Sequence, residues 1–507
     1  MPRINGFPLL TPEEAVTAID HGATVSFSGF TPAGAAKVVP RALAARARSE
    51  HVAGRPFKVR VLTGASSGQV IDEELARAEA VAWRAPYQSG AALRRQINQE
   101  QVEYVDMHLS HLPQTVLFGF FGRIDLAVVE ATDVTRDGRV FLTTSIGASP
   151  TYLQYADRVV IEINRRHSPR LCEMADILVL PPPPHRLPIP IHEPLDRVGL
   201  AYARVDPRKI IGIVENDAPD EVSPFSPAGA NGQHIAEHLV SFLLAEMRAG
   251  RIPKEFLPLQ AGVGNLTNAV MAGLGAHPDI PPFAMYSEVL QDAIIDLIAA
   301  GRVLGASATA LPITAPKMAE VVENLDFFAP RIVLRPQEIS NHPGVIRRLG
   351  VIALNTALEA DIYGNVNSSH LYGTDIVNGI GGSGEFTRNS YLSIFMTAST
   401  ARNGRISSIV PMVPHVDSNE HSVQVLVTEQ GLADLRGLGP MQRARRIIAN
   451  CAHPAYRDYL ADYLKKGRPG HIRHDLARCF ELHRNLLATG RMLPEEAPPA
   501  PPGGGNG

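Results

Sequence analysis

Apolar residues along the chain alternate between a spacing typical of strands and a spacing typical of helices. An early example is the strand-like stretch 24–27 (TVSF), followed by a glycine turn, a helical pattern ending near Arg48 and a second strand-like stretch at 59–62 (VRVL). The two patterns continue to alternate over almost the whole chain. Such alternation indicates helices packed on sheets of mostly parallel strands, so the predicted fold class is α/β.

Two proline-rich stretches interrupt this alternation, at 180–194 and at 216–229. Proline fixes φ and removes a backbone donor, so neither stretch can continue a helix or a central strand. The second fits best as a domain junction, because the strand-like segment 209–215 (KIIGIVE) just before it closes the first half.

A chain of 507 residues is long for a single hydrophobic core. We therefore predict an N-terminal domain at 1–222 and a C-terminal domain at 223–493. The tail 494–507 is rich in proline and glycine, a composition typical of disorder.

A weak internal echo links the two halves. SFSGFTPAG (26–34) precedes VVEATDVTRDGRV (128–140) by about the distance that separates LQAGVGNLTNA (259–269) from TALEADIYGNV (356–366). The matching order and spacing favour two related domains. Two unrelated halves are the alternative.

Composition and charge narrow the class of protein. With 45% hydrophobic and 20% charged residues and a net charge of −3, the chain has no basic field, which argues against a nucleic-acid partner. Its three cysteines are far apart and form no CxxC pair, which argues against a disulfide framework and a structural zinc site. No signal-like start or long apolar span is present, so we expect a cytoplasmic protein without a membrane segment.

Glu288 lies in the stretch 281–298 (PPFAMYSEVLQDAIIDLI), at a predicted strand-to-helix junction. The apolar residues 282–286 read as a strand, and the positions from Val289 onward follow a helical spacing. A carboxylate at such a junction is either a partner of the helix dipole or a catalytic group. The local pattern leaves both hypotheses open.

Two glycine clusters follow in the second half. In GVGN (262–265), Asn265 can cap the next helix while backbone N–H groups face outward, as in turns that bind anions or polarise a carbonyl. NGIGGSGEF (378–386) satisfies G-x-G-x-x-G, but 388–396 predicts a strand, so a dinucleotide fold would lack its phosphate-binding helix. We expect close approach of backbone to a ligand, with Gly382 N–H as a donor to negative charge; a mobile loop is the alternative.

Other candidate motifs favour structural roles. Ser287 lacks the glycines of a nucleophile elbow, so a serine hydrolase is not indicated. The spacing in PHVDSNEH (414–421) fits no common metal site and indicates a solvated loop. The arginines of GVIRRLG (344–350) predict a surface helix, and Glu429 and Asp434 lie near a glycine turn where capping is the usual role.

Taken together, six segments resemble the family I coenzyme A transferases. They are SGFTPAG near the N-terminus, FLPLQAGVGN, YSEVLQD, EADIYGNVNSS, NGIGGSGEF and VTEQGLADLRGL. The likeness covers roughly residues 3 to 493. It is strongest to the single-chain acetyl-CoA hydrolase/transferase group, which includes propionyl-CoA:succinate and succinyl-CoA:acetate CoA-transferases. This resemblance implies two tandem related α/β domains with mostly parallel sheets, an active site at their interface, and a homodimer.

The resemblance also assigns roles to residues. It makes Glu288, in the Ser-Glu motif, the catalytic nucleophile, with Gly382 and Val263 as backbone oxyanion donors and Asn341 and Glu429 in support. It implies coenzyme A and its thioesters as substrates, with no metal and no permanently bound cofactor. The residues that it implies for coenzyme A binding are Gly262, Val263, Gly264, Asn265, Leu266, Asn378, Gly382 and Arg402, the last at a position where relatives often have lysine.

The expected chemistry begins when Glu288 attacks a thioester carbonyl in a dry cleft, where proximity makes a weak nucleophile effective. An acyl-glutamyl anhydride and then a glutamyl-CoA thioester would follow, and a helix N-terminus at 289–291 would favour the ionised carboxylate. The family likeness points to succinate as one carboxylate, with propionate or acetate as the other. An acyl-CoA hydrolase and a non-catalytic acyl-CoA-binding protein are the competing functions.

Overall fold

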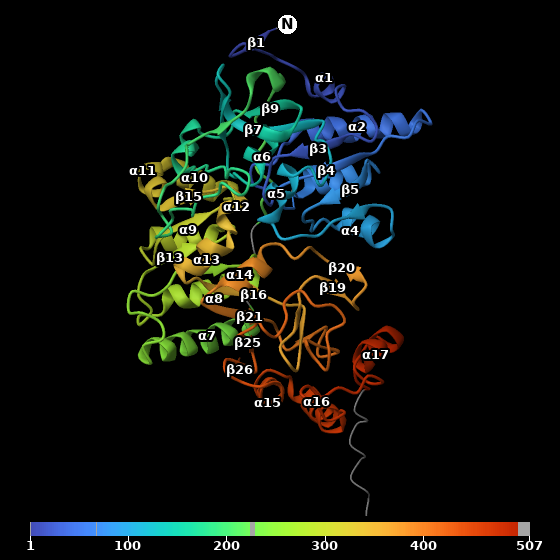
Figure 1. Cartoon of the computed structure of the whole chain (residues 1–507), viewed down its shortest axis with the longest axis vertical. Coiled ribbons are helices and arrows are strands. Elements are labelled where there is room, and N and C mark those ends of the chain that lie inside the picture. Colours follow the sequence, from blue (N-terminus) through green and yellow to red (C-terminus); the bar gives the residue numbers. More distant parts are fainter. Residues whose placement is uncertain (1, 67, 224–228, 495–507) are drawn as a thin grey trace, which may run out of the picture.

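The computed structural model describes residues 2–66, 68–223 and 229–494. It contains two α/β domains, one after the other along the chain, and each is built on its own mostly parallel sheet (Figure 1). The predicted fold class is confirmed. The described part of the chain contains no helix long and apolar enough to cross a membrane.

The first sheet is built from the N-terminal part of the chain. Seven of its strands run parallel, in the spatial order β11, β9, β7, β3, β4, β5, β6, while β8 and β10 add antiparallel pairs at the end of β7. The strands are β3 Thr24–Phe27, β4 Val59–Leu62, β5 Val81–Ala85, β6 Glu103–Tyr104, β7 Leu126–Val134, β8 Arg139–Leu142, β9 Arg158–Asn164, β10 Ala203–Arg204 and β11 Ile210–Asn216.

The second sheet has eight strands in the order β15, β14, β13, β12, β16, β21, β25, β26, and only the last pair is antiparallel. The strands are β12 Leu259–Ala261, β13 Phe283–Tyr286, β14 Val303–Ala308, β15 Ile332–Leu334, β16 Ile352–Thr356, β21 Leu392–Met396, β25 Val425–Thr428 and β26 Gly431–Asp434.

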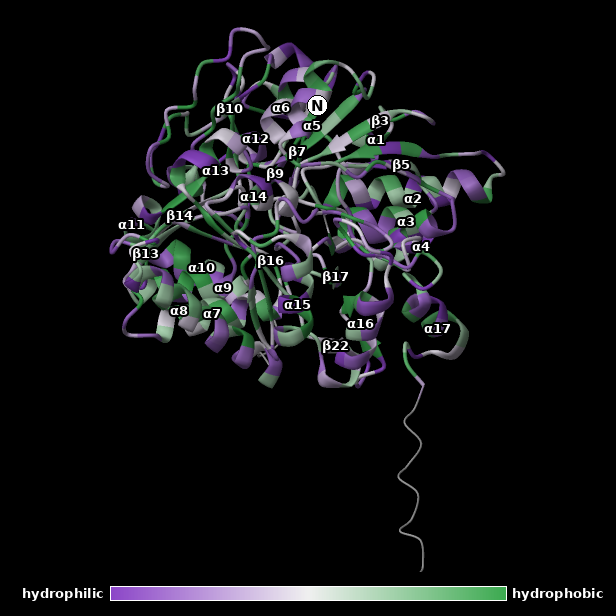
Figure 2. Cartoon of the chain, turned by 60° about the horizontal axis from the view of Figure 1, so that its bottom comes forward, coloured by the Kyte–Doolittle hydropathy of each residue, from purple (hydrophilic) through white to green (hydrophobic). Residues whose placement is uncertain are grey.

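The helices cover these sheets with one apolar side. In α2 (Val38–Val52), Val39, Leu43 and Ala47 recur at every fourth position and are fully buried. Burial of such a side chain contributes about 1.5–3 kcal/mol for Val or Leu, which fixes the helix on the sheet. The sequence pattern had predicted that this helix ends near Arg48, but it continues to Val52. Figure 2 shows the sheet strands around β3 and β5 largely in the hydrophobic colour.

The remaining helices complete the layers. In the first half they are α1 Pro12–Val16, α3 Glu74–Arg77, α4 Ala91–Asn98, α5 His111–Leu117 and α6 Ser149–Tyr155. In the second half they are α7 Ala230–Arg248, α8 Asn265–Ala276, α9 Asp292–Ala299, α10 Ala315–Glu323, α11 Leu325–Phe328, α12 Gln337–Ser340, α13 Pro343–Leu349 and α14 Ser383–Asn389.

A further hydrophobic cluster, which the sequence did not suggest, lies at the C-terminal end. It joins a small sheet of β18 (Val366–Asn367), β17 (Glu359–Asp361) and β24 (Ile409–Val410) to three helices, α15 (Pro440–Asn450), α16 (Pro454–Lys466) and α17 (Glu481–Thr489). These helices lie at the lower, red end of the molecule in Figure 1. The chain thus adds a satellite core to the two sheets.

The proline-rich stretch 180–194 forms neither helix nor strand, as predicted, although Ile189 and Ile191 are buried in a hydrophobic cluster. The boundary stretch 216–229 includes residues 224–228, and the predicted disordered tail includes 495–507. Both sets lie outside the described residues, so the domain boundary and the tail stay predictions.

The segments of the internal echo occupy matching places. In the first half β3 pairs in parallel with β7, and in the second half β12 pairs in parallel with β16. They differ further along, because Glu130 lies inside the continuous strand β7 whereas Glu359 begins β17, in a separate sheet.

Arg335 joins the two halves at their buried boundary. Its guanidinium pairs with the Asp176 carboxylate, donates to the carbonyl of Pro194 at 3.1 Å, and is fully buried. Nearby, the backbone N–H of Asp176 donates to the carbonyl of Leu334 at 2.8 Å. A charged group without water must have partners for its charge, so this pair fixes how the halves meet.

We predict that Asp176→Ala lowers the free energy of unfolding by about 3–5 kcal/mol, because it leaves the Arg335 charge buried without its carboxylate. The measurement is the shift of the urea unfolding midpoint. Asp326→Ala is the matched control: its ion pair with Arg170 also links the two halves, but its side chain is 89% exposed, so its loss should cost about 1 kcal/mol or less. Equal shifts for both variants would contradict this role of Arg335.

Candidate active site

The backbone around Glu288 belongs to no helix or strand and is held by hydrogen bonds to the neighbouring strand and the segment after it. After β13 ends, Ser287 N–H donates to the carbonyl of Ser307 at 2.8 Å, and the Glu288 carbonyl accepts from the N–H groups of Thr309 at 2.8 Å and Ala310 at 3.3 Å. Helix α9 starts only at Asp292. The predicted helix N-terminus at 289–291 is therefore wrong. Val289 and Leu290, the first apolar positions of the predicted helix, are buried beside the segment that follows β14 instead.

The Glu288 carboxyl lies in a largely dry environment, and Asn341 Nδ2 donates to its Oε1 at 2.5 Å. Burial raises the pKa of Glu288 to about 7, and the Asn341 hydrogen bond offsets only part of this effect. The expectation that a helix beginning at 289–291 would favour the ionised form is wrong, since α9 begins only at Asp292. The helix that begins beside the carboxyl is α14 (Ser383–Asn389), whose N-cap is Gly382. The side chain keeps a partly accessible surface, because it faces a cavity.

That cavity has a volume of about 270 Å³ and lies between the two domains. The first domain contributes Phe30, Ala65 and Tyr87 to its wall, and the second contributes Glu288 and the glycine loop 378–383. Glu288 and the glycine loop therefore lie at the domain interface, where the resemblance placed the active site; that this cavity is the active site stays a prediction. Its wall mixes apolar side chains with backbone polar groups, as is usual for small-molecule sites.

Gly382 lies directly against the Glu288 carboxyl. A Cβ at this position would be 1.8 Å from Glu288 Oε1 and 2.2 Å from Asn341 Nδ2, so any side chain would overlap both. Within the described residues no acceptor is bonded to the N–H of Gly382. Gly382 thus brings backbone against the Glu288 carboxyl, and its predicted role as a donor to a ligand stays a prediction.

Other glycines of this loop have a different role from the predicted one. A Cβ at Gly379 would be 2.4 Å from Asp106 Oδ1, and a Cβ at Gly384 would be 2.5 Å from a ring carbon of His108. Asp106 also accepts from the N–H of Ile380, at 2.9 Å and 3.0 Å to its two oxygens. These two glycines therefore let the loop pack against the first domain rather than against a ligand.

A helix does follow this loop, which corrects the prediction that 388–396 is a strand. Helix α14 covers Ser383–Asn389, with Gly382 as its N-cap, and β21 begins only at Leu392. The dinucleotide hypothesis still fails. The loop follows β20 (Asp375–Ile376), which pairs only with β19 (His370–Leu371) in a separate two-stranded sheet, and not with a strand of the parallel sheet.

The GVGN turn forms the opposite wall. Gly262 and Val263 line the cavity, but the N–H of Gly262 donates to the carbonyl of Leu354 at 3.0 Å, so this amide is not free for a ligand. Gly264, with φ of 136°, is the N-cap of α8, and Asn265 is its first residue. The prediction that Asn265 caps this helix is wrong, and Leu266 also lies within its first turn.

The remaining predicted residues divide into two groups. Asn378 lines the cavity beside the glycine loop, and Asn341 touches Glu288. Arg402 and Glu429 do not line it: Arg402 is exposed, in the turn between β22 (Thr400–Ala401) and β23 (Ile406–Ser407). Burial raises the pKa of Glu429, but hydrogen bonds from Ser399, Gln430 and the backbone together lower it by more. The bonds from Ser399 tie Glu429 to the segment before β22.

Sequence reasoning missed one functional candidate, Glu385. Its Oε2 accepts from Asn341 Nδ2 at 2.9 Å, so a single amide group contacts both Glu385 and Glu288. Burial raises the pKa of Glu385 to about 8, and the neighbouring Glu288 adds to the effect. The only signal in the sequence was its place in NGIGGSGEF, three residues after Gly382.

Two alternative interpretations of the sequence lose support in the structure. Ser287 Oγ donates to the carbonyl of Ala261 at 3.1 Å and is fully buried, so it cannot serve as a nucleophile. In the PHVDSNEH segment, Asp417 binds His415 at 3.2 Å and the N–H of Ser368, which agrees with the predicted loop of satisfied side chains.

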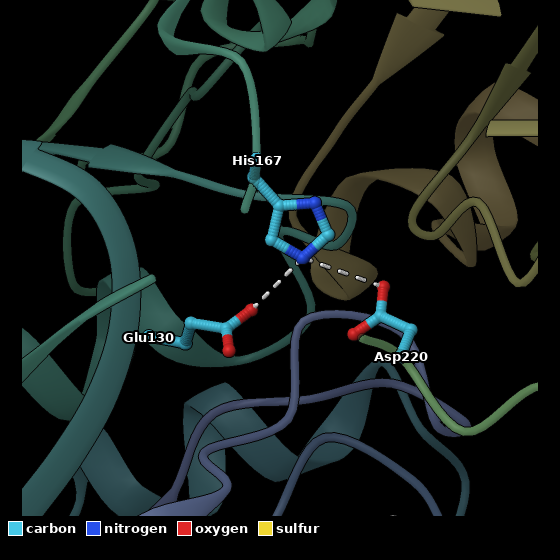
Figure 3. A group of neighbouring side chains, drawn as sticks. All are labelled: Glu130, His167 and Asp220. Carbon is cyan, nitrogen blue, oxygen red and sulfur yellow. Dashed lines mark ion pairs between the residues drawn. The ribbon is translucent and has the colours of Figure 1, made fainter. Parts of the chain in front are cut away.

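One group of side chains in the described part of the chain has metal-ligand geometry: Glu130, His167 and Asp220 (Figure 3). The Lys37 ammonium, however, contacts Glu130 and lies 3.0 Å from Asp220 Oδ1. Burial lowers the pKa of Lys37, but the two carboxylates raise it by more, so the cluster already holds a cation. We assign it a structural role, in which it ties Asp220 to β7; the absence of a metal stays a prediction.

Comparisons with known proteins agree with this geometry. The acetyl-CoA hydrolase/transferase N-terminal domain family matches residues 8–215, and the corresponding C-terminal domain family matches 318–464. In the solved structure of RipA from Yersinia pestis, the fold matches with a TM-score of 0.70 and 26% identity, over 90% of this chain and 97% of that one.

Three curated relatives match almost end to end. Propanoyl-CoA:succinate CoA transferase of Escherichia coli is 56% identical, over 96% of this chain and 98% of that protein. Succinyl-CoA:acetate CoA-transferase of Clostridium kluyveri is 43% identical, over 96% and 90%. Acetyl-CoA hydrolase of Schizosaccharomyces pombe is 41% identical, over 95% of each. The chain therefore belongs to the acetyl-CoA hydrolase/transferase family and is an enzyme of the coenzyme A transferase type.

Proposed function

We propose that this enzyme moves coenzyme A between a short-chain acyl-CoA and a carboxylate, with Glu288 as the covalent carrier. The observation that carries the proposal is the contact between Gly382 and the buried Glu288 carboxyl. A glycine is required there so that backbone can lie against the carboxyl, which binding of acyl-CoA alone would not need.

The first step forms one bond and breaks another. A Glu288 oxygen attacks the thioester carbonyl, the C–S bond breaks, and coenzyme A leaves as the thiolate, which gives an acyl-glutamyl anhydride. The thiolate then attacks the glutamyl carbonyl, releases the first carboxylate and forms a glutamyl-CoA thioester. The second carboxylate reverses both steps, so no proton or electron is gained or lost overall.

Backbone donors can stabilise the oxygen that becomes negative in each step. Gly382 lies beside the Glu288 carboxyl and Val263 lines the same cavity, and the N–H group of neither has an acceptor among the described residues. Fixed donors of this kind need no reorganisation during the reaction, and each typically contributes about 2.7–4 kcal/mol.

The acyl pair follows from the relatives' names. We propose succinate as one carboxylate and propionate or acetate as the other, since the two named transferases use these acids. Coenzyme A would enter along Gly262, Val263 and Asn378, with the start of α8 and the exposed Arg402 available to its phosphates. Contacts with this distant part can offset the energy of the anhydride.

Hydrolysis is the second candidate, because the similar Schizosaccharomyces pombe protein is named an acetyl-CoA hydrolase. The chemistry would be the same up to the covalent intermediates, with water taking the place of the second carboxylate. The small, partly apolar cavity favours transfer, since a bound acyl group would leave little room for water beside it.

We predict that propionyl-CoA, added without an acceptor, leaves coenzyme A on Glu288. The test is intact-protein mass spectrometry followed by borohydride reduction, which converts the thioester to an alcohol, and peptide mapping. Glu288→Gln should abolish the adduct, because an amide is not a nucleophile. The control is Glu338→Gln, which removes another buried carboxylate, paired with Arg186, and should keep the adduct. An adduct on another peptide would contradict the assignment.

With succinate present, we expect most of the coenzyme A to appear as succinyl-CoA. Transfer should exceed release of free coenzyme A at least about tenfold, which corresponds to about 1.4 kcal/mol between the two barriers. Chromatography of the products, with and without succinate, gives both rates. Equal release of free coenzyme A under the two conditions would make the enzyme a hydrolase.

Gly382→Ala should lower kcat/KM by at least about a hundredfold, since its methyl group overlaps the Glu288 carboxyl and displaces it by an ångström or more. Steady-state kinetics provide the measurement. Gly229→Ala is the matched control: Gly229 is also the N-cap of a helix, but a Cβ there would meet nothing within 4 Å. A near-normal rate for Gly382→Ala would contradict the close contact.

A further inference from the structure

Two buried carboxyl groups share one donor in this site. Asn341 Nδ2 lies 2.5 Å from Glu288 Oε1 and 2.9 Å from Glu385 Oε2, so its two hydrogens are directed to two acids. Asn341 is completely buried and Glu385 is only 4% exposed. Water can therefore do little to screen the repulsion between two negative charges held so close together.

The second oxygen of Glu385 is held by the other domain. Its Oε1 accepts from the backbone N–H of Ser110 at 2.8 Å, and the Ser110 hydroxyl also bonds to this carboxyl. A hydroxyl can donate to a carboxylate or accept from a neutral acid. Ser110 can therefore satisfy Glu385 in either protonation state.

Building on the proposed function, we propose that Glu288 and Glu385 form a carboxyl pair that holds one proton at neutral pH. The reactive form is the one in which Glu385 keeps this proton and Glu288 is the ionised nucleophile. Glu385 is then a positioning residue: it touches no substrate, keeps Asn341 aimed at Glu288, and removes the second negative charge from the site.

The electrostatics of the surroundings agree with this assignment. Burial raises the pKa of Glu288 to about 7 and that of Glu385 to about 8, so the pair loses its first proton near the lower value and its second near the higher. Tyr87, whose pKa is raised by burial and by Glu288, faces the pair across the cavity. Other titratable or charged groups on the elements around α14 are Asp106, His108, His342, Arg347 and Arg348, with Arg388 on α14 itself. Of these groups, none shares a hydrogen-bond donor with Glu385 in the described structure.

The proposal predicts a bell-shaped dependence of kcat/KM for acyl-CoA on pH. Below about 7 both acids are protonated and Glu288 cannot attack; above about 8 both are ionised, and the second charge opposes the anionic transition state. Each limb should change the rate by about tenfold per pH unit. The alkaline limb is diagnostic, because acyl-CoA itself carries no group that titrates there.

Glu385→Gln should remove the alkaline limb, so that its rate relative to the wild type rises by about tenfold per pH unit above about 8. The acid limb should stay near pH 7, since in the wild type Glu385 is still neutral when Glu288 ionises. Glu338→Gln, three residues before Asn341, is the matched control and should keep both limbs. An unchanged alkaline limb in Glu385→Gln would overturn the proposal.

A second measurement reads the proton without using activity. The infrared spectrum of the wild type minus that of Glu385→Gln, at pH about 7, should contain the carbonyl band of a protonated carboxyl group, and this band should vanish at pH about 9.5. A difference spectrum with carboxylate bands only would overturn the proposal that the two carboxyl groups share a proton at neutral pH. If the wild type transfers no coenzyme A, the proposed function fails, while the infrared result still decides whether the proton is shared.

Discussion

In the proposed mechanism the Glu288 carboxylate must be shielded from water and must also stay ionised to attack a thioester, and these two demands oppose each other. Burial raises the pKa of Glu288 to about 7, so the same burial that would bring an acyl group close also favours the neutral, unreactive form of the carboxyl. The structure offsets part of this cost with the Asn341 amide. The elements around the site keep the Glu288 carboxyl buried and at the same time supply a hydrogen bond that favours its ionised form.

Both domains contribute to the surroundings of the Glu288 carboxyl. The second domain supplies Glu288 and Asn341, but the glycine loop keeps its position through Asp106, a residue of the first domain that accepts from Ile380. Gln337 Nε2 likewise donates to the carbonyl of Leu109 at 2.8 Å, across the same boundary. Because these contacts hold segments that adjoin Asn341 and Gly382, both of which touch Glu288, docking of the domains positions the groups around this carboxyl.

The sequence predicted what depends on local pattern and failed where distant residues meet. The alternating spacing gave the parallel sheets, and the Ser-Glu motif singled out Glu288. The same apolar spacing misplaced the start of α9. Val289 and Leu290 are buried beside the segment that follows β14, so in the sequence they have the same apolar pattern as one face of a helix. Glu385 was missed for a different reason: its role arises from its contact with Asn341, forty-four positions earlier in the chain.

The glycine loop shows why one motif can carry several constraints at once. Gly382 leaves room for the Glu288 carboxyl, whereas Gly379 and Gly384 leave room for side chains of the first domain. A sequence pattern records only that no side chain is tolerated, and it does not record what fills the space. The same limit applies to the choice between transfer and hydrolysis. In the proposed mechanism both reactions use Glu288 and Gly382, and they differ in whether a carboxylate or water enters the remaining part of a cavity of about 270 Å³. On this proposal the wall of the cavity decides between the two reactions, because the nucleophile is common to both.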